Sequence, residues 1–410
     1  MRARRLAARW VFPIEGCPIE HGAVLVGADG RIESVGPTDA VPHPENVPAL
    51  SFEDAALLPG FVNTHTHLEL TGFEGRLPVR EFPLWIHQLH QLKLTRTPTE
   101  YLAAAHQGIR DCYATGVTTV ADTGDSGAVI TALAEAGGSG IAYQEVFGPD
   151  PAQAVESLTA LQNKVRELGA HTTSRVRIGV SPHAPYTVSG ALYRAVAGWA
   201  KAERLPIAVH IAESAAETQF LLSGTGPFAE GWRKRGIALP SPQGHTPVSW
   251  LAEHGVLTEQ TLCIHAVHVG SRDVQRLWES GTAVAHCPLS NRSHGHGNAP
   301  VQLMLQAGIR VGLGTDSVAS VERLDLLAEA RAAGQLASLS ADDQLELCTL
   351  GGARALGLDA ETGSLRPGKW ADCTVIRLTA TTGTPAERVV ASSPADVVLT
   401  CVGGREVYRS

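Results

Sequence analysis

This sequence of 410 residues lacks closely spaced cysteine pairs, long apolar runs and blocks of basic residues. Its seven cysteines are an odd number and widely scattered, which argues against a disulfide framework and a thiolate metal site. No segment offers the ~18 apolar residues of a membrane helix. The 33 Lys and Arg are outnumbered by 41 Asp and Glu, which argues against nucleic acid as a partner. We therefore expect a cytoplasmic protein without a membrane partner, in which carboxylates and some of the 17 histidines hold any metal.

Short apolar runs alternate with segments of helical spacing through the middle of the chain, which predicts an α/β fold. The expected strands are 58–66, 117–123, 140–147, 175–182, 207–213, 262–268, 283–288 and 310–316. The expected helices include 99–115, with Thr99 as its N-cap, and 321–333. Eight such units predict a parallel (β/α)8 barrel, a TIM barrel, over residues 58–365. An open doubly wound sheet stays the alternative, because periodicity does not reveal closure.

The two ends of the chain differ from this middle region. Residues 6–57 alternate polar and apolar side chains in short runs, and Ala28-Asp29-Gly30 between two of them is typical of a hairpin turn. Similar runs return at 371–376 and 396–400. We therefore predict a small β-sandwich domain built from residues 1–57 plus 366–410, beside a catalytic barrel over 58–365.

Histidines and carboxylates recur where the predicted barrel strands end, which is the rim that carries active sites in this fold. His65 and His67 stand two apart on one strand, so their side chains share a face. His210, His265 and Asp316 end three later strands. Each alone is as readily a hydrogen-bonded core or capping residue, but together they indicate a site. His65, His67, His210 and Asp316 would suit one divalent cation with room for a water. The predicted third and fourth strands contain no Lys that could bridge two metals.

Four segments of the sequence resemble the amidohydrolase superfamily. They are 58–67 (LPGFVNTHTH), 210–213 (HIAE), 287–291 (CPLSN) and 314–317 (GTDS). The nearest branch is the cytosine deaminase-like group that includes purine nucleoside deaminases and chlorotriazine hydrolases. The resemblance covers essentially the whole chain. It implies hydrolytic deamination of a heterocycle by one metal ion, with Zn²⁺ favoured and Fe²⁺ left open.

The resemblance also implies roles for individual residues. His65, His67, His210 and Asp316 match the metal ligands, and Asp316 takes a proton from the bound water. Glu213 matches the acid that carries protons to the ring nitrogen and the leaving amine, with Glu69 as its rival. His265 matches the histidine that orients the nucleophile, with His268 as its rival.

Substrate residues are expected in three places. The segment Ser181–Tyr186 resembles the motif whose histidine, here His183, contacts the nucleoside, and Trp85 matches an aromatic lid residue. Purine nucleoside deaminases of this group carry a ribose-binding Glu shortly after that Trp, but 86–94 of this sequence contains no acid. The loop after the seventh strand carries Arg292 and His294, which we expect to bind an acidic substrate tail.

This loop, the stretch 67–72 and the long connection 214–260 look most like aminodeoxyfutalosine deaminases. The resemblance therefore favours 6-amino-6-deoxyfutalosine, an intermediate of menaquinone biosynthesis, as the substrate. The alternatives are S-adenosylhomocysteine, methylthioadenosine or adenosine, or the substrates of guanine deaminases, cytosine deaminases and triazine hydrolases. A non-enzymatic scaffold is disfavoured because no metal ligand is missing. We expect a small-molecule substrate, and a homodimer stays open.

Overall fold

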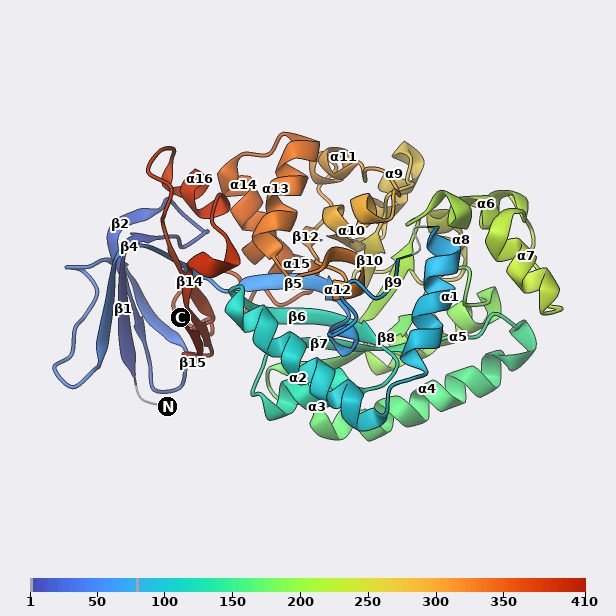
Figure 1. The fold of residues 1–410 in the computed structure, drawn as a ribbon, viewed down its shortest axis with the longest axis horizontal. Coiled ribbons are helices and arrows are strands. Elements are labelled where there is room, and N and C mark those ends of the chain that lie inside the picture. The colour runs from blue at the N-terminus through green and yellow to red at the C-terminus, as the bar shows by residue number, and fades with distance from the viewer. Residues whose placement is uncertain (1–2, 79–80) are drawn as a thin grey trace.

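The computed structural model describes residues 3–78 and 81–410, so residues 1 and 2 of the expected terminal domain lie outside it. A ring of parallel strands forms the centre of the molecule, helices surround it, and a second sheet lies at one end with both chain termini (Figure 1). None of the described helices combines the length and apolarity needed to cross a lipid bilayer.

Eight strands form the ring, and each pairs in parallel with the next along the chain. They are β5 (Phe61–Thr66), β6 (Val117–Gly124), β7 (Gly140–Val146), β8 (Val176–Pro182), β9 (Ile207–Ile211), β10 (Thr261–His265), β11 (Ala283–His286) and β12 (Val311–Leu313). Six of them are buried along their whole length, as expected for strands covered on both faces. Each of the eight predicted runs therefore overlaps one of the eight strands, although the first run begins three residues before β5 and the last ends three residues after β12.

The ring closes between β12 and β5. The backbone N–H of Asp316 donates to the carbonyl of His65 at 3.0 Å. Just below, Asn63 donates to Thr315 Oγ1 at 2.8 Å and accepts from the Thr315 backbone N–H at 3.1 Å. This seam decides for the barrel and against the open sheet.

Sixteen α-helices occur in the described residues. They are α1 (Phe82–Lys93), α2 (Pro98–Ala114), α3 (Ala128–Glu135), α4 (Ala154–Leu168), α5 (Gly190–Glu203), α6 (Ala215–Ser223), α7 (Gly226–Lys234), α8 (Pro247–Glu253), α9 (Ser271–Glu279), α10 (Pro288–Ser293), α11 (Val301–Gln306), α12 (Val318–Val321), α13 (Leu326–Ala337), α14 (Ala341–Glu346), α15 (Gly352–Ala355) and α16 (Pro385–Val390). Three of them, α6, α7 and α8, fill the long connection between β9 and β10.

Two helix boundaries differ from the prediction. The N-cap of α2 is Thr97 and not Thr99, because Thr97 and Glu100 form a capping box around Pro98 at the first helical position. The expected helix 321–333 begins five residues too early: Val321 is the last residue of α12, which Glu322 ends with a φ of 64°, and α13 starts at Leu326. Helical spacing did not reveal this interruption.

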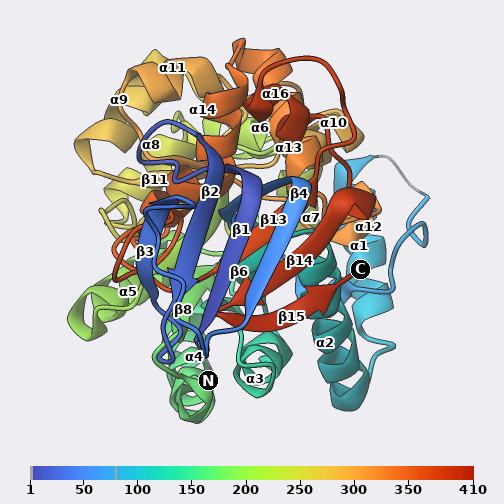
Figure 2. The ribbon, with the colours of Figure 1, turned by 90° about the vertical axis from the view of Figure 1, so that its left-hand side faces the viewer.

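Strands from both ends of the chain form one seven-stranded sheet, seen in Figure 2, in the order β15-β14-β13-β4-β1-β2-β3. Its strands are β1 (Arg4–Val11), β2 (Ile19–Val26), β3 (Ile32–Pro37), β4 (Ala49–Pro59), β13 (Cys373–Arg377), β14 (Val397–Val402) and β15 (Arg405–Arg409). The two terminal segments form one continuous sheet, because β13 pairs directly with β4. Side chains from both halves share one buried cluster, which includes Leu6, Leu57 and Val375.

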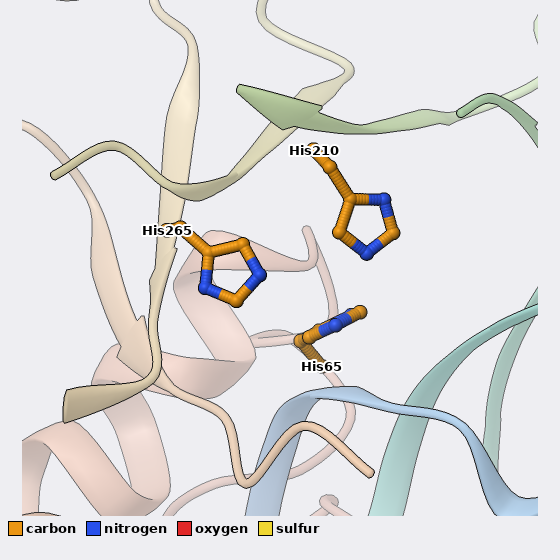
Figure 3. Close-up of side chains that lie close together, drawn as sticks. All are labelled: His65, His210 and His265. Carbon is orange, nitrogen blue, oxygen red and sulfur yellow. The ribbon is translucent and has the colours of Figure 1, made fainter. Parts of the chain in front are cut away.

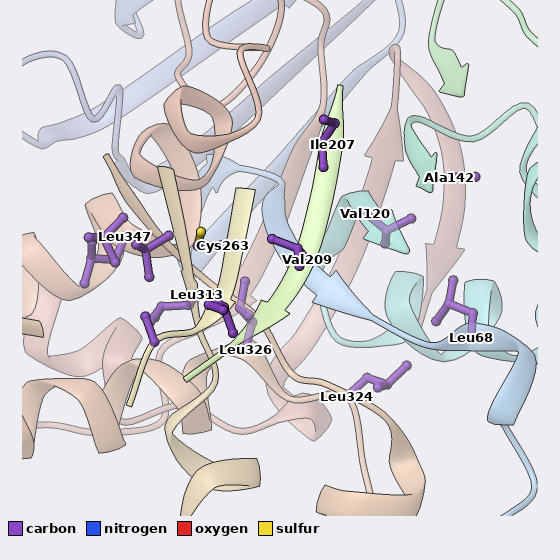
Figure 4. Packing of buried hydrophobic residues seen from close by; sticks show 14 of the residues in the cluster. Leu68, Val120, Ala142, Ile207, Val209, Cys263, Leu313, Leu324, Leu326 and Leu347 are labelled. Atoms are coloured by element: carbon purple, nitrogen blue, oxygen red, sulfur yellow. The ribbon is translucent and has the colours of Figure 1, made fainter. Parts of the chain in front are cut away.

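Buried apolar side chains fill the space between the barrel strands and the helices (Figure 4). A buried ion pair ties the barrel to the terminal sheet: Arg175, just before β8, contacts both carboxylate oxygens of Asp372 at 2.6 and 2.7 Å. Asp372 also accepts from Thr362 Oγ1 and from the backbone of Gly403. The strand ends on the opposite side of the barrel are therefore held on a rigid support.

Candidate metal centre and active-site cavity

Histidines from three strand ends converge inside the barrel rim. The ring centroid of His65 lies 4.8 Å from that of His67, 4.9 Å from that of His210 and 5.6 Å from that of His265. Figure 3 shows His65, His210 and His265 pointing toward one another from β5, β9 and β10. The carboxylate of Asp316, just beyond β12, lies 3.6 Å from His65 Nε2 and 3.5 Å from His67 Nε2. The structure thus brings together the four residues expected to bind the metal, with His265 beside them.

These side chains are suited to coordinating a cation. His67 Nδ1 contacts the carbonyl of Thr123 at 2.7 Å, an arrangement in which Nδ1 carries the proton and Nε2 is free to bind a metal. Both ring nitrogens of His65 and Nδ1 of His210 are buried without a hydrogen-bond partner in the described structure. Buried polar atoms without a partner are costly, so such atoms at the centre of a cluster fit the binding of a cation. Three imidazoles and one carboxylate are a donor set that zinc accepts.

The protonation states also agree with metal binding. Burial, reinforced by the neighbouring imidazole of His65, lowers the pKa of His67 to about 4, and burial lowers that of His210 well below its usual value. Burial alone would raise the pKa of Asp316, but the neighbouring imidazoles of His65, His67 and His265 outweigh it and hold this pKa well below its usual range. His67 and His210 are therefore neutral and the carboxylate of Asp316 is ionised near neutral pH, as metal ligands must be.

The backbone is strained where these strands end. Ala212, His265 and Asp316 have φ angles of 51°, 72° and 60°, a region that non-glycine residues rarely adopt. Hydrogen bonds hold Asp316 in place, because its carboxylate accepts from Ser290 Oγ and from the backbone of Ser317. These backbone conformations orient the side chains of His265 and Asp316 toward the centre of the histidine cluster.

Glu213 follows β9 directly, and its side chain is buried beside the metal cluster. Its Oε1 lies 3.6 Å from His265 Nε2 and 3.4 Å from His296 Nε2. Burial, with the nearby negative charge of Asp316, raises the pKa of Glu213 well above its usual value. The carboxylate of Glu217 accepts from the backbone N–H groups of Ala212 and Glu213 at 2.7 and 3.0 Å, which fixes this turn. Two carboxyl groups with opposite pKa shifts therefore flank one site, a combination suited to acid–base chemistry.

A cavity of about 670 Å³ opens over this centre. Much of its wall is aromatic or apolar, including Trp85 and Ile86 of α1, Phe147 and Tyr186 from the barrel rim, and Phe228 of α7. The rings of Tyr186 and Phe228 are stacked with centroids 4.0 Å apart. The cavity therefore offers flat apolar surfaces around a polar, metal-binding base, which suits an aromatic heterocycle with a substituent.

Of the four expected substrate residues, three line this cavity: Trp85, His183 and His294. His183 lies 4.8 Å from His210 between ring centroids, and its Nδ1 is 2.8 Å from Thr187 Oγ1. Trp85 is buried, and its ring packs edge-on against that of His294 with the ring centroids 4.5 Å apart.

The loop after β11 departs from the expectation. His294 lines the cavity and lies 3.1 Å from Ser320 Oγ, but Arg292 is exposed on α10 and is not among the cavity-lining residues. The structure does not bring Arg292 to a substrate held in the cavity. The position of Arg292 on the helix α10 turns its side chain outward.

His268, the rival to His265, also lies outside the cavity lining. His265 does line the cavity, and its Nδ1 contacts Asn291 Oδ1 at 3.0 Å.

Sequence reasoning missed several residues of the site. His296 contacts Glu213, yet in the sequence it was only one of two histidines in a Gly-rich loop. Lys93, Asp125 and Glu145 form one wall of the cavity, and Arg235 lies at its edge after α7. No local motif marks these residues, because they come from α1, from the segments after β6 and α7, and from β7.

Glu69, the rival proton carrier, is engaged elsewhere. Its buried carboxylate lies 2.9 Å from Lys93 Nζ and accepts from Ser126. It does not line the large cavity. The structure therefore favours Glu213 for chemistry on a bound substrate.

Comparison with known proteins gives consistent relatives. A sequence model of the amidohydrolase family matches residues 56–407. A 5-methylthioadenosine/S-adenosylhomocysteine deaminase of Symbiobacterium thermophilum is 30% identical over 408 residues, covering 95% of this chain and 89% of that protein. A zinc-bound adenosine deaminase of Xanthomonas campestris is 25% identical with a TM-score of 0.84, covering 98% of this chain and 92% of the other. The aminofutalosine deaminase of Helicobacter pylori, solved with methylthio-coformycin, is 22% identical with a TM-score of 0.84, covering 99% and 100%.

Proposed function

The chain belongs to the amidohydrolase family, and on this basis we propose that it is a metal-dependent hydrolase that deaminates an adenine nucleoside and releases ammonia. The observation that carries the proposal is the placement of buried Glu213 beside three histidines and Asp316, at the base of a largely apolar cavity. The nucleoside deaminases among its relatives support the same reaction class.

His65, His67, His210 and Asp316 would hold one divalent cation, for which zinc is the best candidate given the donor set and the zinc-bound relative. Such a cation lowers the pKa of a coordinated water toward neutrality and so supplies the nucleophile.

The protein side chains then divide the proton transfers. Asp316, ionised at neutral pH, accepts a proton from the attacking water, and His265 orients that water through its Nε2. Glu213, whose raised pKa keeps it protonated, donates its proton to the ring nitrogen next to the carbon under attack. It then receives the proton from Asp316 and passes it to the amine, which leaves as ammonia when the tetrahedral adduct collapses. The hydroxyl proton that the adduct loses as its C=O bond forms returns to Glu213 and restores the acid. The retained Glu213 favours an amine over chloride as leaving group, because ammonia must be protonated to depart.

The favoured substrate is 6-amino-6-deoxyfutalosine, an adenine nucleoside extended by a carboxylated phenyl ketone. The size of the cavity and the stacked Tyr186 and Phe228 support an aromatic extension. Arg235, exposed at the edge of the cavity, is a cation that its carboxylate could meet. Methylthioadenosine or S-adenosylhomocysteine is the second candidate, because a curated relative with 30% identity deaminates those nucleosides, as its name states.

A substrate panel tests both levels of the proposal. The zinc-loaded protein should release ammonia from adenine nucleosides and lose this activity when a chelator removes the metal. The value of kcat/KM should be highest for the carboxylated nucleoside. Release of ammonia from guanine or cytosine but from no adenine nucleoside would overturn the proposed function. A higher kcat/KM for methylthioadenosine would overturn only the favoured substrate.

A further inference from the structure

Glu145 is a buried carboxyl group that the proposed mechanism does not use. It stands near the end of β7, is 7% exposed and lines the large cavity. Its Oε1 has no hydrogen-bond partner in the described part of the chain. Because an unpaired buried acceptor is unfavourable, this atom is best explained by a donor that arrives with the ligand.

The other carboxylates that line the described cavity already have partners. Asp125 pairs with Lys93 at 2.6 Å, and Asp316 accepts from Ser290 and Ser317. The remaining one, Glu213, lies against two histidines at the reacting end. Glu145 is therefore the carboxyl group of this wall that keeps acceptor capacity for a ligand. Burial raises the pKa of Glu145 to about 8, and hydrogen bonds donated by a ligand would favour its ionised form.

The charge around Glu145 indicates what kind of ligand group it would meet. Lys93 is the cation of this wall, and Glu69 and Asp125 both contact its Nζ, at 2.9 and 2.6 Å. The wall therefore carries at least as much negative as positive charge and does not suit an anionic group. It suits neutral hydrogen-bond donors, and two neighbouring hydroxyl groups match the two oxygens of one carboxylate.

The position of Glu145 agrees with the sugar of a bound nucleoside. Possible ligand atoms of Glu145, His183 and His210 all lie within 4.8 Å of one another, so Glu145 adjoins the reacting centre. Glu213 follows β9, which lies two strands away from β7 in the ring. A base that directs its ring nitrogen to Glu213 must place its other substituents along the remaining wall, which includes Glu145 and α1.

We propose that Glu145 is the sugar-binding carboxylate of this enzyme and accepts hydrogen bonds from the vicinal hydroxyls of the nucleoside. The inference rests on the proposed function. It assigns the recognition of the sugar to β7, since residues 86–94, which span the later part of α1 and the residue after it, contain no acid. The carboxylate of Glu145 thereby distinguishes, inside the cavity, a nucleoside that has both sugar hydroxyls from its deoxy analogues.

The test compares adenosine with 2′,3′-dideoxyadenosine on the zinc-loaded parent protein, on Glu145→Gln and on Glu230→Gln. The last variant is the matched control, because Glu230 is exposed on α7 and does not line the cavity. The parent should prefer adenosine by about 10- to 150-fold in kcat/KM, the range for one hydrogen bond to a charged group. In Glu145→Gln, kcat/KM should fall for adenosine and not for 2′,3′-dideoxyadenosine, so that most of the preference is lost. The zinc content should be unchanged. Glu230→Gln should behave as the parent does.

Other outcomes separate the two proposals. Equal kcat/KM of the parent for both nucleosides would overturn the role of Glu145 and leave the deaminase function standing. Equal losses for both nucleosides in Glu145→Gln, together with less bound zinc, would show that Glu145 supports His210 or a second metal instead. No activity of the zinc-loaded parent on any adenine nucleoside would overturn the function and, with it, this assignment. If Glu145→Gln does not fold, two other measurements decide the question. They are the preference of the parent for adenosine over 2′,3′-dideoxyadenosine, and the retention of that preference by Glu145→Asp, which keeps a carboxylate.

Discussion

Replacing Glu213 by Gln is the most direct test of the proposed chemistry. The amide keeps the size of the side chain and its place beside His265 and His296, but it cannot donate and recover a proton. General acid–base catalysis typically contributes about 10²–10⁴-fold, and Glu213 is used both at the ring nitrogen and at the leaving amine. We therefore expect kcat to fall by about 10³–10⁴-fold, which equals roughly 4–5.5 kcal/mol of transition-state stabilisation.

Binding and folding should survive this change. The metal ligands are untouched, so the zinc content should stay at one ion per chain. Because burial raises the pKa of Glu213, its ionised form is unfavourable in the folded protein, and a neutral amide removes that cost. The thermal midpoint at alkaline pH should therefore not decrease. The assay is ammonia release from adenosine, with zinc measured on the same samples and the KM determined separately.

Glu69→Gln is the matched control, since it makes the same change in a second buried glutamate near the metal ligands in sequence. It removes one of the two carboxylates that contact Lys93, and we expect a loss of about 3 kcal/mol in the free energy of unfolding. The folded variant should keep kcat within about an order of magnitude of the parent. Near-parental turnover by Glu213→Gln, or a much larger loss of kcat in Glu69→Gln, would refute the assignment of the proton carrier.

Three further predictions concern the metal, the proton carrier and the substrate tail. Asp316→Ala should bind less than one zinc per chain and lose ammonia release, whereas full metal content in an active variant would exclude Asp316 as a ligand. His296→Gln should lower kcat by about tenfold or more at a similar KM, because it removes a partner of Glu213, and an unchanged pH–rate profile would contradict this positioning role. Arg235→Ala should reduce kcat/KM for a carboxylated nucleoside by about three- to tenfold, while Arg292→Ala should not, because the side chain of Arg292 is exposed outside the cavity. The opposite order of effects would show that the loop after β11 contacts the tail.

Local pattern was sufficient to predict the barrel strands and the residues at their ends. His65 and His67 share a face because side chains alternate along a strand, and that relation is visible in the sequence. His210, Glu213 and His265 follow apolar runs, and the fold places the ends of parallel strands on one rim. The helix boundaries were less accurate, because the capping box at Thr97 and the break at Glu322 depend on single backbone conformations.

Tertiary structure decided the features that join distant segments. The seam between Asn63 and Thr315 closes the ring, and β13 joins β4 in one continuous sheet, neither of which follows from periodicity. The path of the loop after β11 brings His296 to Glu213 and turns Arg292 outward, although both lie in the same short segment. Sequence by itself therefore determined which residues end the strands, since this depends on a repeat of two residues. Contacts between loops depend on the whole packed chain, and only the tertiary structure supplied them.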